Sequence, residues 1–434
     1  MRIIKKYMLN DGEIFDQPPE PLTAEEDIRR LGRGTDRIDI IDTEKQGILG
    51  FGGAFTQASG ENYMKLSPDE KRRCLDLLFG DDGLRYRFCR VCIGSPDFSS
   101  EPYCYIEDGD TDLHSFDIGR DRRDVIPFIR DALEYTGGGI FLFASPWTPP
   151  AHLKSSGSLT GGRLLREYYP LWADYFVRFI EEYEKEGIRI SAVTVQNEPG
   201  KHRWESCEWS DGELCDFTKL LAKKLDALPR KVDIYGWDYN RGGMMEHMKR
   251  LYAAAWDSVA GAGFHWYNGA HTGELDAHRL AFPGKLLVET EFCHGISARM
   301  YRKYRVELID VLSHWTSAVT EWNLLLDEAG GPYHSRDIGC NSPVYRKGAE
   351  CLPRGIYREM YMFSHFIDAG SKVLCSSSAF PSVKTLCVRR PDGKLLVYAY
   401  NDSVRDEKVT YCLGEARWTA ESPAGCLTLY ILDN

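Results

Sequence analysis

The chain has 434 residues, 43% of them hydrophobic, which is enough for a barrel of about 250 residues with a smaller unit attached. Its formal net charge of −11 argues against a nucleic-acid partner, because such proteins carry basic surfaces that neutralise phosphate. No stretch approaches the ~20 unbroken apolar residues of a membrane span, so we expect no stable membrane insertion.

The beginning of the chain and its cysteines give an expectation for location. Residues 1–6 are basic, but no apolar core of about seven or more residues follows them, so the segment does not resemble a secretory signal. Thirteen cysteines without a compact framework favour reduced thiols. Cys89 and Cys92 form a C-x-x-C inside a strand-like run, where alternation points them to opposite faces and disfavours a redox or zinc motif. We expect a cytoplasmic protein.

Strand-like runs alternate with helical stretches along most of the chain. A strand is predicted at 37–42, then a glycine-rich strand at 48–56, then a helix that Ser67 caps and Pro68 begins. Further strands are predicted at 86–93, 140–144, 190–195, 232–236, 263–267, 286–291 and 318–322. Most connections carry apolar residues at helical spacing. From 48–56 onward this gives eight alternating units, which predicts a TIM barrel.

The pattern changes near residue 370. Short strands separated by turn signals such as Pro391-Asp392-Gly393 are predicted at 373–376, 385–389, 394–400, 408–412 and 427–432. That pattern is typical of an antiparallel sandwich, and we expect the strand at 37–42 and any strands before it to join it. The predicted fold class is therefore α/β: a (β/α)8 TIM barrel at 46–367 with an attached all-β sandwich domain built from residues 1–45 and 368–434.

Two of the predicted barrel strands end in carboxylates. The run at 190–195 is followed by Gln196-Asn197-Glu198-Pro199, and the run at 286–288 by Glu289-Thr290-Glu291. The carboxyl ends of barrel strands share one face, and two carboxylates on one face are the minimal apparatus for cleaving a glycosidic bond. Because the chain has 65 acidic residues, one such Glu is more often a helix or loop charge, so the inference depends on the pair.

Aromatic and polar residues follow several other strands. Asp97 follows the second barrel strand and Trp147 the third, while His265 and Tyr267 end the sixth and Trp322 the eighth. Aromatic rings stack on the C–H face of a sugar and polar groups bind its hydroxyls, so this set is typical of a saccharide site. His265 has no second histidine at ligand spacing, so we interpret it as a neutral hydrogen-bonding residue and predict no metal.

Five motifs resemble glycoside hydrolase family 30. They are Phe51-Gly52-Gly53-Ala54-Phe55-Thr56, Ala144-Ser145-Pro146-Trp147-Thr148, Asn197-Glu198-Pro199, His265-Trp266-Tyr267, and Trp322-Asn323 with Gly330-Gly331-Pro332. Within that family, their order and spacing from about residue 48 to the chain end are similar to the glucosylceramidases, the acid β-glucosidases. The resemblance implies a barrel with an attached sandwich and a retaining double displacement through a covalent glycosyl-enzyme, without metal or organic cofactor.

The resemblance also implies catalytic roles. Glu198, in the Asn-Glu-Pro motif, is the expected acid/base. Glu291, which matches the family's Glu-x-Cys, is the expected nucleophile, with Glu289 on the same strand face as its rival. At the distance of a retaining pair both cannot be ionised comfortably, so Glu198 is expected to keep its proton in the free enzyme while Glu291 stays charged.

Substrate-binding roles follow from the same resemblance. Asn197 is expected to bind the sugar's 2-hydroxyl, and Tyr267 to hold the nucleophile. Arg90 either helps to keep the nucleophile ionised or forms a structural ion pair in the barrel mouth. Asp97 and Trp147 match positions that bind the far hydroxyls and edge of the glycone, and Trp322 matches part of its floor.

The predicted function is a retaining, exo-acting β-glycosidase that hydrolyses β-glucosides, with a small carbohydrate or glycoside as its partner. The loops at 201–205 and 333–337 differ from those of the lysosomal enzymes, which puts a ceramide in doubt. Alternatives are a β-xylosidase or β-fucosidase, an endo-β-1,6-glucanase or xylanase on the same scaffold, and, more remotely, a non-catalytic carbohydrate-binding relative. Trp204 and Trp209 fit either an aglycone site or a subunit contact. The exact glycone and the oligomeric state stay open.

Overall fold

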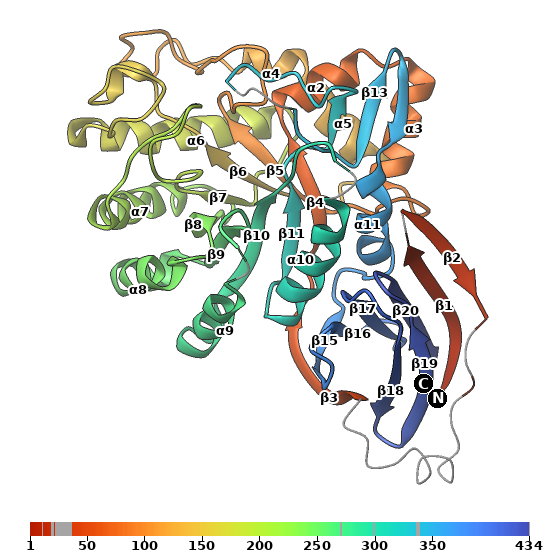
Figure 1. Cartoon of the computed structure of the whole chain (residues 1–434). Helices are drawn as coiled ribbons and strands as arrows, with labels where there is room; N and C mark the ends of the chain where they lie inside the picture. Colours follow the sequence, from red (N-terminus) through yellow and green to blue (C-terminus); the bar gives the residue numbers. More distant parts are fainter. Residues whose placement is uncertain are drawn as a thin grey trace. The chain divides into compact units, whose positions relative to one another are not determined.

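The computed structural model describes residues 1–10, 12–18, 21, 37–269, 271–297, 300–335 and 339–433, and the chain forms two compact units (Figure 1). The first unit comprises Met1–Gly50, Ser297–Ser317 and Gly355–Asn434, and the second comprises Phe51–Ile296 and Ala318–Arg354. The predicted boundaries, 1–45 with 368–434 and 46–367, stay a prediction. No described helix combines the length and apolar character needed to cross a membrane.

Eight parallel strands close the barrel of the second unit. In order around the barrel they are β4 (Gly50–Phe55), β5 (Phe88–Ile93), β6 (Phe141–Pro146), β7 (Ala192–Thr194), β8 (Asp233–Asn240), β9 (Gly261–His265), β10 (Leu286–Phe292) and β11 (Ala318–Glu321). Each corresponds to one of the strands predicted between 48–56 and 318–322, so the predicted TIM barrel is confirmed.

Helices connect the barrel strands, and the spacing of apolar residues in the sequence indicates which face of a helix is buried. The helices of this unit are α2 (Gln57–Met64), α3 (Pro68–Phe79), α4 (Gly119–Arg123), α5 (Val125–Tyr135), α6 (Tyr169–Lys185), α7 (Asp211–Leu225), α8 (Met244–Ala255) and α9 (Thr272–Ala281). Helix α3 begins as predicted, with Ser67 accepting the Glu70 amide and Pro68 in the first turn. Trp172, Phe176 and Phe179 recur at helical spacing on α6 and are fully buried.

Glycine allows two barrel strands to approach closely beside the site. A Cβ on Gly52 of β4 would lie 1.8 Å from the carbonyl oxygen of Phe88, just inside β5, so no other residue fits there. The same virtual Cβ would lie 3.0 Å from the Cys89 sulfur, whereas Cys92 packs in a different cluster with Trp147. The two cysteines of the C-x-x-C thus have different surroundings.

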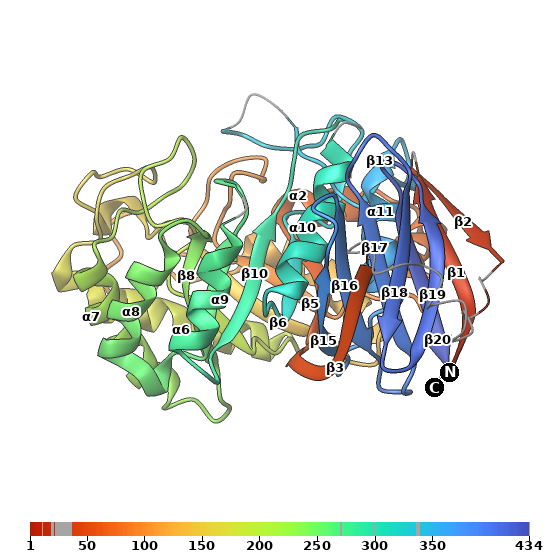
Figure 2. The same cartoon turned by 60° about the horizontal axis from the view of Figure 1, so that its bottom comes forward.

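The described strands of the first unit form a single sheet of nine strands. Its order is β19 (Ala416–Ser422), β18 (Glu407–Leu413), β3 (Arg37–Gly47), β15 (Lys372–Ser378), β16 (Val383–Arg389), β17 (Leu395–Asn401), β20 (Leu427–Asp433), β1 (Arg2–Asn10) and β2 (Glu13–Gln17). Figure 2 shows these strands side by side. Trp418 of β19 lies 5.7 Å from Tyr430 of β20, although five strands separate them in the sheet, so the sheet curls and packs on itself. The predicted sandwich is therefore one continuous curled sheet.

The remaining elements were not predicted. A small sheet of β12 (Leu325–Asp327), β13 (Val344–Lys347) and β14 (Glu350–Pro353) follows β11 in the second unit. Helices α10 (Tyr301–Ser313) and α11 (Gly355–Ser364) belong to the first unit. Short 3-10 helices occur at Ala151–Leu153, Arg166–Tyr168 and Trp256–Ser258.

Candidate active site

A cavity of about 190 Å³ opens where the barrel strands end. Seven of the residues singled out from the sequence line it: Asp97, Trp147, Asn197, Glu198, Tyr267, Glu291 and Trp322. The other two, Arg90 and His265, are fully buried and bind the lining carboxylates from behind. His202, Trp204, Tyr239 and Asn240 complete the lining.

Glu198 and Glu291 face each other across this cavity. One carboxylate oxygen of each lies within 4.8 Å of the other and of a ring nitrogen of His265. Both Glu291 oxygens accept hydrogen bonds, from the Tyr267 hydroxyl at 2.9 Å and from the Arg90 guanidinium at 2.8 Å. Burial raises the pKa of Glu291, the cations His265 and Arg90 oppose that rise, and the Glu198 carboxylate adds to it, leaving the pKa above its ordinary value.

Glu289, the rival nucleophile, has a different environment. Its side chain is 0% exposed, and it is absent from the described residues that line the cavity. The pairing of β10 with β9 shifts register between Glu289 and Glu291, so simple alternation does not place both side chains alike. The geometry favours Glu291.

A carboxylate that the sequence analysis missed organises the buried floor. Asp238, at 0% exposure, accepts hydrogen bonds from Arg90 at 2.9 Å and from three hydroxyls, those of Ser145 at 3.0 Å, Thr194 at 2.6 Å and Thr290 at 2.6 Å. Burial alone would raise the pKa of Asp238, but Arg90 and His265 hold it well below its usual range. Asp238 is therefore a permanent anion beneath the two glutamates.

Arg90 links that floor to the cavity. Its guanidinium donates to Asn197 at 2.9 Å and to Ser145 at 3.0 Å, besides the ion pairs with Asp238 and Glu291. Both expectations for Arg90 thus apply at once, because it forms a structural ion pair and also contacts the expected nucleophile.

Three residues at or next to this floor have a strained backbone conformation. Trp237 and Asp238 have φ values of 72° and 59°, and Glu198 has a φ of 46°. Left-handed conformations cost non-glycine residues about 1–3 kcal/mol each and persist only where the surroundings impose them. Here the Glu198 amide donates to the Asp238 carbonyl at 2.9 Å, so the strained segments after β7 and within β8 hold each other.

His265 is charged, which corrects the neutral state expected from the sequence. Its Nδ1 lies 3.2 Å from Glu198 Oε1 and its Nε2 lies 3.1 Å from Asp238 Oδ1. Burial alone would lower the pKa of His265, but Glu291 and the hydrogen bonds to Asp238 and Glu198 raise it to about 10. Asp238 was not among the predicted site residues, so its contact with His265 was not expected.

Stacked tryptophans form one wall of the cavity. Trp147 and Trp322 lie 4.9 Å apart between ring centroids with planes only 17° from parallel, and the Arg90 guanidinium sits 4.8 Å from the Trp147 ring. Asp97, 3% exposed, lines the same cavity. A flat apolar wall beside a carboxylate suits a sugar ring with its hydroxyls.

Three loops meet at the outer edge of the cavity through one ion pair. Glu205, 3% exposed, accepts from Ser95 at 2.9 Å and from His334 Nε2 at 2.9 Å. His334 Nδ1 lies 3.0 Å from the Ser99 carbonyl oxygen and 3.1 Å from the Ser99 hydroxyl, so both ring nitrogens have polar partners. Burial lowers the pKa of His334, but Glu205 outweighs it and raises the pKa above the ordinary value. Of the 333–337 stretch, Arg336 and Asp337 lie outside the described residues.

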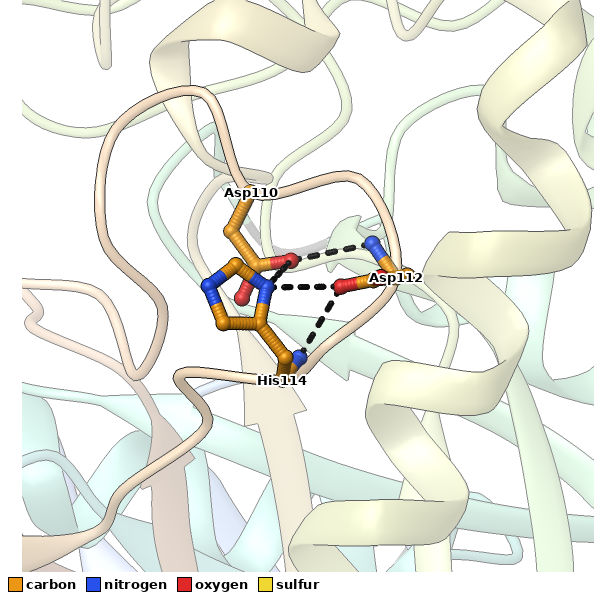
Figure 3. A group of neighbouring side chains, drawn as sticks. All are labelled: Asp110, Asp112 and His114. Atoms are coloured by element: carbon orange, nitrogen blue, oxygen red, sulfur yellow. Dashed lines mark hydrogen bonds and ion pairs between the residues drawn. The ribbon is translucent and has the colours of Figure 1, made fainter.

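Among the described residues, two groups have the geometry of metal ligands. Glu198, His265 and Glu291 form the first, but Arg90 and the charged His265 already satisfy those carboxylates. The second, Asp110, Asp112 and His114, lies in the loop after β5, and Figure 3 shows the His114 ring nitrogen between the two carboxylates.

The second group has a structural explanation. The buried Asp110 carboxylate accepts the backbone amides of Asp112 at 2.9 Å and Ser115 at 2.8 Å. The carboxylate therefore shapes a turn, as Asp side chains commonly do.

The buried carboxylates, the aromatic wall and the barrel mouth define a glycoside-hydrolase site, and the comparisons agree. The family model described as the glycosyl hydrolase family 30 TIM-barrel domain matches residues 48–367. The chain belongs to glycosyl hydrolase family 30.

Three proteins are similar to this chain over most of its length. The lysosomal acid glucosylceramidase of Mus musculus is 30% identical, over 87% of this chain and 79% of that protein. The endo-1,6-β-D-glucanase BGN16.3 of Trichoderma harzianum is 25% identical, over 92% of this chain and 88% of that protein. A crystal structure of SrfJ from Salmonella typhimurium aligns with a TM-score of 0.93 at 26% identity, covering 99% of both chains.

Proposed function

We propose that the chain is a retaining, exo-acting β-glucosidase that works by double displacement. The observation that carries this is the separation of Glu198 and Glu291, whose nearest carboxylate oxygens lie within 4.8 Å. Retaining glycosidases place their carboxyl groups ~5–5.5 Å apart, whereas inverting enzymes need ~6.5–9.5 Å to admit a water molecule. The glucosylceramidase relative supports glucose as the glycone.

In the first step Glu291 attacks the anomeric carbon while Glu198 protonates the glycosidic oxygen, so the bond to the leaving group breaks as the bond to Glu291 forms. Arg90 and Tyr267 fix the attacking carboxylate through its two oxygens. Nδ1 of His265, at 3.2 Å from Glu198 Oε1, holds the Glu198 side chain in place for this transfer.

In the second step Glu198 takes a proton from water, which attacks the glycosyl-enzyme and releases Glu291. Esterification removes the negative charge of Glu291, so Glu198, which gave its proton to the leaving group, is the carboxylate left to accept one from water. Asn197, held by Arg90 at 2.9 Å, is positioned beside Glu198 to bind the 2-hydroxyl of the sugar.

Cavity size supports exo action. About 190 Å³ is below the roughly 300–1,000 Å³ of pockets that enclose drug-sized ligands, so it suits a single sugar ring between Trp147, Trp322 and Asp97. The Trichoderma relative, named as an endo-1,6-β-D-glucanase, favours β-1,6-linked glucose as the second candidate. The xylosidase, fucosidase and xylanase alternatives stay predictions. The cytoplasmic location stays a prediction, since the mouse relative is named as lysosomal.

The test is intact-protein mass after incubation with 2-deoxy-2-fluoro-β-glucosyl fluoride, followed by peptide mapping. The fluorine slows breakdown of the covalent intermediate, so we expect a glucosyl adduct on Glu291. An adduct on Glu289 would replace the nucleophile, and an adduct formed only with the xylosyl analogue would replace the glycone. Absence of an adduct with either probe, in protein that is folded by circular dichroism, would refute the retaining mechanism.

A further inference from the structure

The mouth of the cavity has an unusual composition for a lipid site. Among its described lining residues none is aliphatic: they are the rings Trp147, Trp204, Tyr239, Tyr267, Trp322 and His202, with Asp97, Asn197, Glu198, Asn240 and Glu291. An alkyl chain gains its affinity from a continuous apolar surface that leaves water, whereas five of the eleven lining side chains here are carboxylates or amides. Rings interspersed with amides and hydroxyls instead match the C–H faces and hydroxyls of a sugar.

Three of these rings form a continuous rim that begins at the expected acid. His202 Nε2 lies 3.0 Å from the Glu198 carbonyl oxygen, and its ring is parallel to that of Trp204 within 5°, at 5.0 Å. Tyr239 meets the His202 ring edge-on at 5.7 Å. Because Glu198 protonates the leaving oxygen, the leaving group lies next to Glu198 and therefore beside this rim.

The rim is rigid before any substrate binds. Trp204 packs against the core cluster that contains Trp147 and Trp322, and it precedes Glu205, whose carboxylate is fixed by Ser95 and His334. A ring held in this way loses little further freedom on binding, which favours its use as a stacking surface.

The polar groups of the rim fit a neutral ligand. Burial and the neighbouring Glu198 raise the pKa of Tyr239, so its hydroxyl stays protonated and can donate. Asn240 accepts the Tyr267 amide through Oδ1 at 2.8 Å, which fixes its side chain beside the rim. With Asp97, Glu198 and Glu291 lining the same cavity, an anionic leaving group is repelled.

We infer that the leaving group of the substrate is a second neutral sugar residue, bound on the rim formed by His202, Trp204 and Tyr239. Trp204 is the stacking surface and therefore determines specificity for saccharides over lipid glycosides. This inference rests on the proposed β-glucosidase function and names the substrate class of the same site: β-linked glucobioses and short oligosaccharides.

The experiment compares three kinds of probe on the wild type and on Trp204→Ala. The probes are the 1,3-, 1,4- and 1,6-linked β-glucobioses, octyl β-glucoside as a lipid-like glycoside, and β-glucosyl fluoride, whose leaving group is too small to reach the rim. We expect at least one glucobiose to exceed octyl glucoside in kcat/KM about tenfold or more in the wild type. In Trp204→Ala the ratio of kcat/KM for that glucobiose to kcat/KM for the fluoride should fall about tenfold.

Two further variants sharpen the result. Trp204→Phe keeps a ring and should recover most of that ratio, whereas Trp204→Leu should not. Trp256→Ala removes a tryptophan that is 43% exposed and outside this cavity, and serves as the control for the substitution itself. Preference for octyl glucoside in the wild type, or an equal loss for all probes in Trp204→Ala, would overturn the inference. Failure of the wild type to hydrolyse the fluoride would instead refute the proposed function.

Discussion

The floor of the active-site cavity consists of charged side chains at strand ends, whereas its rim consists of aromatic side chains on loops and at the end of β8. Arg90, Asp238 and His265 in the floor are fully buried and satisfy one another, while His202 and Trp204 in the rim are partly exposed. Floor residues set charge and proton positions, so changes there should act on the rate of every substrate. Rim residues should act on the choice of substrate.

The largest effect is expected at the two carboxylates. Glu291→Gln should lower kcat on the order of 10⁴-fold or more for every glycoside, because the first bond cannot form. Glu198→Gln should lower kcat about 10²–10⁴-fold for glycosides with poor leaving groups, yet spare the first step with dinitrophenyl glucoside, which leaves without protonation. Stopped-flow measurement of the phenolate burst separates the two.

Glu246→Gln on α8, whose side chain is 60% exposed, is the control for these substitutions. Equal and small losses in both catalytic variants would remove the catalytic assignment.

The next effect tests whether the floor acts as a unit. Asp238→Asn keeps the side-chain size but leaves Arg90 and His265 with one carboxylate fewer. We expect kcat to fall about 10²-fold and the free energy of unfolding to fall by about 3 kcal/mol, since removing one partner leaves uncompensated buried charge. Kinetics and urea unfolding measure the two. Asp233→Asn, at the start of the same strand, is the matched control, and a variant of Asp238 within twofold of wild type would contradict the role of the floor.

A smaller effect concerns pH. Glu291 must be ionised to attack, and its pKa lies above the ordinary value, so kcat/KM should decline as pH falls through that raised pKa. His265 is one of the cations that lower the pKa of Glu291, so His265→Gln should move the acid limb to higher pH by ~1 unit. The profile of kcat/KM against pH for glucosyl fluoride measures this. An acid limb at lower pH in the variant would show that His265 does not stabilise the carboxylate.

The smallest effect is expected at the loop ion pair. The raised pKa of His334 means that its pairing with Glu205 stabilises the folded protein fully below the unfolded histidine pKa, and that this contribution disappears as pH rises through the folded value. The Tm difference between wild type and His334→Gln should therefore be largest near pH 6 and shrink by pH 9. We also expect KM for glucobioses to rise about threefold at pH 6, because Trp204 is less firmly held. A Tm difference independent of pH would contradict the charged state of His334.

Much of the barrel was predictable because its strands are short apolar runs whose polar residues come at the end. That pattern placed Glu198, Glu291, Asp97 and Trp147 correctly at strand ends, and the structure brings them around one cavity. What could not be predicted also has a physical reason. Alternation does not reveal a change of register, which is why Glu289 remained a rival to Glu291.

Asp238 shows what the sequence pattern could not indicate. The predicted strand stopped at Gly236, whereas β8 continues to Asn240 through Trp237 and Asp238 in left-handed conformation, with a register shift against β9. Of the eight barrel strands, the first and this fifth one had no site residue assigned to them. The signal in the sequence was an Asp just after a predicted buried strand. Because Asp238 was not predicted as a site residue, the second charged partner of His265 was missed as well.

The curled sheet was predicted less completely for a related reason. Strand β19 buries only Trp418, Ala420 and Ser422 on alternate positions, which is too weakly apolar to stand out. Its pairing with β18 depends on contacts across the curled sheet, such as that of Trp418 with Tyr430, which no local pattern contains.

The last strand of the chain occupies an interior place in that sheet. β20 pairs with β17 on one side and with β1 on the other, and Figure 1 marks the two chain ends close to each other. The first strand therefore has only its partner β2 until some 420 residues later in synthesis, and a truncation that removes β20 opens two sheet edges at once. Exposed edges recruit strands from other molecules, so a chain without β20 should yield aggregates and not a slightly shortened protein.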